Sequence, residues 1–154
     1  MDLLIELKNL TEELDQAGID YALCGGLALA VYAKPRATLD IDIMVAPDSL
    51  SKAKRIIEDL GFTIHAAPME FKGGAVQIHR LTKIDGNTGE HLVLDLLIVT
   101  PETKMAWDSR LTVEWEGGTL KVVSPNGLIF LKSLRKSGQD EDDIEYLRSI
   151  TDED

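Results

Sequence analysis

The chain has 154 residues, of which 44% are hydrophobic and 28% charged, a balance that suits one folded domain and argues against intrinsic disorder. Its formal net charge of −11 argues against the general positive potential with which proteins bind DNA or anionic lipid non-specifically. No apolar run is long enough to cross a bilayer, and the single cysteine, Cys24, excludes an intramolecular disulfide. We therefore expect a cytoplasmic protein with no membrane partner and no non-specific DNA binding.

Helices and strands alternate in the N-terminal half. Leucines recur at helical spacing over 3–14, and Gly18 is a suitable stop for that helix. The apolar run 21–24 predicts a strand that leads into Gly25-Gly26, and alternation over 39–45 predicts a second strand. The remaining elements expected here are a helix over 27–32, a helix over 47–60 closed by Gly61, and a short strand over 62–64.

The C-terminal half contains two hairpin signals and ends in helix. The turn-rich segment DGNTG separates apolar strands over 75–84 and 91–99, and the segment EGG separates strands over 111–115 and 119–123. A short helix is expected over 101–107, and Ser124-Pro125-Asn126 opens a final helical region. Together the elements predict an α/β (α+β) fold with a mixed β-sheet flanked by helices.

Three carboxylates interrupt the strand patterns. Asp40 and Asp42 are two residues apart and therefore point to one face of their strand, while the isoleucines between them face the core. Asp95 lies within the apolar run HLVLDLLIV, where an unpaired charge is costly. Converging carboxylates repel one another, and a divalent cation such as Mg²⁺ relieves that repulsion. The alternative is a solvated strand face for the pair and a strand end for Asp95.

Two glycines, Gly25 and Gly26, stand where a strand turns into a helix. Backbone N–H groups are exposed at the start of a helix, and glycine lets a phosphate approach the backbone without a Cβ in the way. The alternative is a tight turn or close packing of the helix. Because the glycines lie just upstream of Asp40 and Asp42, a phosphate cradle next to metal-binding acids predicts a site for a nucleoside triphosphate.

These residues resemble the core motif of the polymerase-beta-like nucleotidyltransferase superfamily. The matching segments are Leu23-Cys24-Gly25-Gly26, Asp40-Ile41-Asp42 and Leu94-Asp95-Leu96. Within the superfamily the chain is similar to a small bacterial branch related to the abortive-infection (AbiEii-type) toxin nucleotidyltransferases. The branch's Arg-x-Thr-x-Asp-x-Asp pattern matches 36–42, and Lys132, Asp140 and Asp143 match its closing helices.

The resemblance implies a nucleotidyltransferase core over 1–123 with a C-terminal helical extension over 124–154 packed on it. It implies that Asp40, Asp42 and Asp95 are catalytic and hold Mg²⁺ or Mn²⁺, and that Asp95 helps to deprotonate the acceptor hydroxyl. The nucleotide-binding residues that it implies are Gly25, Gly26, Arg36, Thr38 and Lys132. The donor is an NTP, with ATP as the first choice, and the acceptor is an unidentified small molecule, protein or RNA.

Two other functions fit the same residues. The chain is then either a binding module that acts through a protein partner, such as one half of a toxin–antitoxin pair, or an α/β domain whose acids are structural. Under such interpretations Arg36 is a surface arginine that pairs with an acid, and Lys132 is a helix-face lysine. Asp140 and Asp143 then pair or cap within the last helices.

Overall fold

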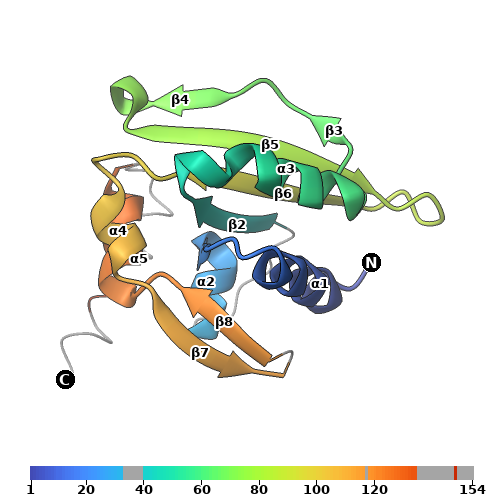
Figure 1. Ribbon diagram of the computed structural model, residues 1–154, viewed down its shortest axis with the longest axis horizontal. Coiled ribbons are helices and arrows are strands. Elements are labelled where there is room, and N and C mark those ends of the chain that lie inside the picture. Colours follow the sequence, from blue (N-terminus) through green and yellow to red (C-terminus); the bar gives the residue numbers. More distant parts are fainter. Residues whose placement is uncertain (33–39, 117, 135–147, 149–154) are drawn as a thin grey trace.

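The computed structural model describes residues 1–32, 40–116, 118–134 and 148. Its centre is an eight-stranded mixed sheet in the order β3-β5-β6-β2-β1-β8-β7, with β4 paired to β5 (Figure 1). The strands are β1 (Ala22–Cys24), β2 (Asp40–Val45), β3 (Ile64–His65), β4 (Met69–Phe71), β5 (Val76–Ile84), β6 (His91–Ile98), β7 (Leu111–Trp115) and β8 (Gly118–Val122). The helices are α1 (Leu3–Gln16), α2 (Gly25–Val31), α3 (Leu50–Asp59), α4 (Lys104–Asp108) and α5 (Pro125–Ser133).

One face of the sheet packs its apolar residues against α1 and α3, which contact each other (Figure 1). Leu81, Leu94 and Ile41 face one another across β5, β6 and β2, and each is 0% exposed. The leucines of α1 that recur at helical spacing are buried on the same core. Because this face takes the odd-numbered residues of β2, the even-numbered Asp40 and Asp42 are directed to the opposite face.

Local capping explains where two of the helices begin. The Asp2 carboxylate accepts hydrogen bonds from the backbone N–H groups of Leu4 and Ile5, which would otherwise lack partners at the start of α1. The Ser124 hydroxyl accepts a hydrogen bond from the N–H of Gly127 and so caps α5. In the described part of the chain, no helix is both long and apolar enough to cross a membrane.

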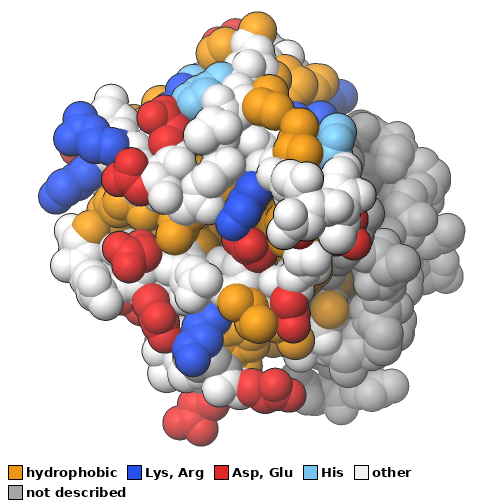
Figure 2. Space-filling model, turned by 90° about the vertical axis from the view of Figure 1, so that its right-hand side faces the viewer, with side chains coloured by type: hydrophobic (Ala, Val, Ile, Leu, Met, Phe, Trp, Pro, Cys, Tyr) orange, Lys and Arg blue, Asp and Glu red, His pale blue; other side chains and the backbone are white. Residues whose placement is uncertain are grey.

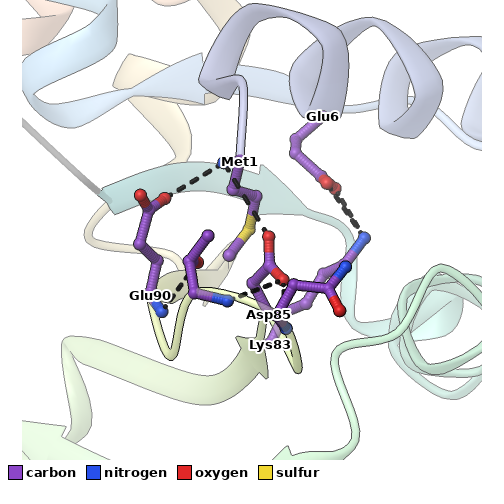
Figure 3. Close-up of polar contacts among 7 residues, drawn as sticks. Met1, Glu6, Lys83, Asp85 and Glu90 are labelled. Carbon is purple, nitrogen blue, oxygen red and sulfur yellow. Dashed lines mark hydrogen bonds and ion pairs between the residues drawn. The ribbon is translucent and has the colours of Figure 1, made fainter.

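Ion pairs hold the far end of the β5–β6 hairpin to the start of α1 (Figure 3). The Met1 ammonium lies 3.0 Å from a Glu90 carboxylate oxygen and 3.9 Å from Asp85, and its hydrogen bond to Glu90 raises the pKa of the amino group. Lys83 donates to both carboxylate oxygens of Glu6 at 2.9 and 3.1 Å. On this side of the molecule acidic, basic and hydrophobic side chains are interspersed rather than gathered into a basic patch (Figure 2).

The predicted α/β fold with a mixed sheet flanked by helices is confirmed, and both predicted hairpins are present. The strand predicted over 62–64 lies slightly later, at β3, and Phe62 is buried just ahead of it. Strand β4 was not predicted. It has 3 residues and only the beginning of β5 as its partner, so too little alternation is present for the sequence to indicate it.

Candidate active site

Three polar side chains form a row across adjacent strands on the sheet face opposite α1 and α3, and the buried Cys24 ends the row. Register pairs Arg80 with Asp95, Asp95 with Asp42, and Asp42 with Cys24, from β5 through β6 and β2 to β1. Residues paired in register project from the same face of a sheet. Thus the DxD strand and the later acid, which are far apart in sequence, lie beside each other because β2 and β6 are parallel neighbours.

Arg80 and Asp95 form a two-pronged ion pair within this row. Nε and Nη2 of Arg80 donate to the two Asp95 carboxylate oxygens at 2.8 and 3.0 Å. Asp95 is only 5% exposed, so its charge is kept in the sheet by this partner. The hydrogen bond to Asp95 raises the pKa of Arg80, and the charges of Asp95, Asp40 and Asp42 act in the same direction.

The glycine turn touches the DxD strand directly. Gly25 has a left-handed φ of +68°, which favours glycine. A Cβ placed on Gly25 would lie 2.8 Å from Asp42 Cγ and 2.9 Å from Asp42 Cβ, and it would overlap the Asp42 carboxylate oxygen. Both the backbone angle and the lack of space therefore demand glycine. Gly26 follows as the second residue of α2 and is half-buried.

The carboxylates suit a divalent cation in kind but are not gathered around one point. Asp42 and Asp95 are side by side, whereas Asp40 is exposed at the start of β2 and pairs with Val93 rather than with an acid. Among the described residues, no group of three or more His, Cys, Asp or Glu side chains is placed to hold a metal ion. The convergence of three acids that the sequence predicts is therefore not seen, because Asp40 stands one pleat away and Arg80 holds Asp95.

A cavity of about 590 Å³ opens over the polar row. Its floor includes Cys24, Asp42, Asp95 and Arg80, and α5 contributes Lys132 to its wall. Lys132 lies on a helix, as its alternative interpretation has it, but is only 6% exposed. Lysine is rarely this buried, and Lys132 lines the same cavity as Asp42 and Asp95.

Arg80 is a site residue that the sequence did not single out, and four of the predicted residues fall outside the described part of the chain. Arg36, Thr38, Asp140 and Asp143 lie outside the described residues. The sequence does contain a signal for Arg80. The DGNTG turn pairs Ile84 with His91, and following the antiparallel register four residues away from the turn pairs Arg80 with Asp95.

Comparison with known families agrees with this geometry. Residues 1–131 match a family described as uncharacterised nucleotidyltransferases, and the chain belongs to that family. The resemblance to the nucleotidyltransferase superfamily is thereby confirmed, and the chain is an enzyme of nucleotidyl transfer whose acceptor the family leaves open. Comparison with curated proteins found no match.

Solved structures share the fold at low sequence identity. The lincomycin-bound lincosamide antibiotic adenylyltransferase LnuA matches with a TM-score of 0.60 and 18% identity, over 94% of this chain and 96% of that one. ANT(2″)-Ia in complex with adenylyl-2″-tobramycin matches with a TM-score of 0.65 and 13% identity, over 94% of this chain and 87% of that one. At these identities the likeness shows the fold alone.

Proposed function

We propose that this enzyme transfers a nucleoside monophosphate from an NTP, with ATP as the first choice, to a hydroxyl group of an acceptor. The observation that carries the proposal is the contact of Gly25 with Asp42, beside Asp95, on the floor of one cavity. Family membership supplies the reaction class. Four of the residues that the sequence singles out line this cavity, namely Gly25, Asp42, Asp95 and Lys132.

Asp42 and Asp40 would hold Mg²⁺ or Mn²⁺, with Asp95 as a further ligand, since carboxylate oxygens are the ligands that these ions prefer. When bound, such an ion neutralises charge on the triphosphate and on the departing pyrophosphate. Asp42 and Asp95 are adjacent in register, and Asp40 shares their face of the sheet.

The chain's own groups then have separate roles. Asp95 accepts the proton of the acceptor hydroxyl, whose oxygen forms the new bond to the α-phosphorus while the bond to pyrophosphate breaks. Arg80 orients Asp95 through its two hydrogen bonds. Lys132, buried in the cavity wall, supplies positive charge for the phosphates, and the backbone at Gly25 and Gly26 lets them approach closely.

We also propose roles for residues and segments that the family resemblance implies. Arg36 and Thr38 are proposed as nucleotide contacts, and the chain is proposed to consist of a core over 1–123 and a helical extension over 124–154 that supplies Lys132. Similarity to the abortive-infection branch leaves a role in a toxin–antitoxin pair as the second function. Co-purification of a stoichiometric protein partner from the native cell would support that second function.

Isothermal titration with a non-hydrolysable ATP analogue, with and without Mg²⁺, tests the proposal. We expect metal-dependent binding that Asp42→Asn weakens at least about tenfold. Asp108→Asn is the matched control, because Asp108 is on the surface of α4 with a side chain 55% exposed and bound to Lys104. Binding that does not depend on Mg²⁺ would contradict the proposed function. Equal weakening of binding by Asp42→Asn and Asp108→Asn would contradict it as well.

A further inference from the structure

We propose that the β4–β5 end of the same cavity is the acceptor subsite, and that it takes a small hydroxylated molecule whose body is largely apolar and not polycationic. The inference rests on the proposed function and specifies its acceptor class. It is carried by an apolar row next to the polar row, by an exposed phenylalanine, and by a lysine with strained backbone.

The apolar row lies two residues along the strands from Arg80 and Asp95. Register pairs Met69 with Ile78 and Ile78 with Leu97, across β4, β5 and β6. All three residues line the cavity. A molecule resting on this row would therefore lie beside the Asp95 carboxylate, within the same cavity.

The order of the strands separates this end from the nucleotide end. Gly25 begins α2, which contacts β1, and Lys132 lies on α5, which contacts α2, whereas β4 and β5 are on the other side of β6. Asp42 and Asp95 stand between the two ends. If the phosphates occupy the glycine end, an acceptor that brings its hydroxyl to Asp95 must extend toward β4 and β5.

Phe71 and Val76, which pair in register, extend the apolar lining of the cavity. The Phe71 residue is 51% exposed although it lines the cavity. Because this apolar side chain lines the cavity, a ligand in the cavity can pack against it. An apolar acceptor would remove this surface from water.

Lys72 places a positive charge at the same end. It is the one described non-glycine residue with a left-handed φ, of 54°, and Gly73 and Gly74 continue the left-handed turn. Such a backbone is costly for lysine, and strained residues of this kind concentrate at functional sites. Glu70 alternates to the opposite face of β4, so Asp42 and Asp95 are the acids among the described lining residues. This charge arrangement disfavours a polycation.

The test uses four glucosides that share one hydroxylated head and differ in tail: methyl, hexyl, 6-aminohexyl and 5-carboxypentyl. Each is titrated into the full chain saturated with the ATP analogue and Mg²⁺. We expect the hexyl glucoside to bind at least about tenfold more tightly than the methyl glucoside, and the carboxypentyl glucoside more tightly than the aminohexyl one. Equal affinity for methyl and hexyl glucosides, or preference for the aminohexyl tail, would overturn the inference.

Variants locate the effect. Phe71→Ser should remove most of the hexyl preference, whereas Ile64→Ser, at a residue 48% exposed on β3 and away from the cavity, should leave it unchanged. Lys72→Glu should reverse the order of the carboxypentyl and aminohexyl glucosides. Equal effects of Phe71→Ser and Ile64→Ser would also overturn the inference.

The two proposals fail in different ways. If the chain shows no metal-dependent binding of the ATP analogue, the proposed function is refuted, irrespective of the affinities for the glucosides. Intact nucleotide binding without tail selectivity would refute the acceptor subsite alone.

Discussion

Replacing Gly25 by alanine tests the contact between the glycine turn and the DxD strand. At a φ of +68°, a side chain costs about 1–2 kcal/mol. The added Cβ also meets Asp42 Cγ at 2.8 Å and must push that side chain or strand β2 away, which costs about 1–3 kcal/mol more. We therefore expect Gly25→Ala to lower the free energy of unfolding by about 2–5 kcal/mol, measured by urea denaturation.

Gly18 provides a matched control for the backbone term. Its φ is +69°, and no described atom lies within 4 Å of the position of an added Cβ. Gly18→Ala should therefore show only the cost of left-handed backbone, about 1–2 kcal/mol. Both substitutions reduce the entropy of the unfolded chain equally, so the difference between them measures the crowding by Asp42.

A double-mutant cycle identifies the crowding group. In an Asp42→Gly background no side chain at position 42 remains for the added Cβ to displace, and the cost of Gly25→Ala should fall to that of Gly18→Ala. If Gly25→Ala costs no more than Gly18→Ala in the natural background, the close approach of the turn to Asp42 is refuted. The same result would show that the Gly25-Gly26 turn is not packed against the strand that carries Asp40 and Asp42.

Three other substitutions probe neighbouring features by urea denaturation. Asp95→Asn should lower the free energy of unfolding by about 1–2 kcal/mol, because it breaks the ion pair between the buried Asp95 carboxylate and the partly exposed Arg80. The loss should exceed that caused by Asp42→Asn, and the reverse order would contradict the pairing of Arg80 with Asp95. Lys72→Gly should stabilise the chain by about 0.5 kcal/mol by relieving its left-handed backbone, and a clear loss of stability would refute the strain. The hydrogen bond from Lys121 lowers the pKa of Asp20, so this group adds stability above its ordinary pKa that is lost as the pH falls through the lowered one. Asp20→Asn should therefore flatten the stability profile below about pH 4, and an unchanged acid limb would contradict the pairing with Lys121.

Local patterns in the sequence were sufficient to predict most helices and strands, because the spacing of apolar residues in each element reflects which of its sides is buried. The alternation of 39–45 placed Ile41 and Ile43 in the core, and both are 0% exposed. The same alternation directed Asp40 and Asp42 away from the core. Met44 shares their face but is also 0% exposed, since α2 contacts this part of the sheet. Alternation assigns a face and does not say what covers it.

The candidate site depends on pairings that local patterns do not contain. Asp42 lies beside Asp95 because β2 and β6 pair in parallel, and a parallel pairing of separated strands has no turn from which to count the register. Arg80 differs, since a single hairpin connects it to Asp95 and its register follows from the turn. The cavity position of Lys132 depends on how α5 meets the sheet, and a pattern within α5 does not determine that.

The Arg80–Asp95 pair also explains how acids can occupy adjacent strands before any cation binds. Two carboxylates directly opposite each other in neighbouring strands repel, most strongly when one is as buried as Asp95. Arg80 stands next in the row and supplies the compensating charge, so the sheet can form with its acids in place. Asp95 is therefore structural and a candidate catalytic group at once. Loss of stability on its replacement cannot by itself decide between the two roles, whereas the effect of Asp42→Asn on metal-dependent nucleotide binding can.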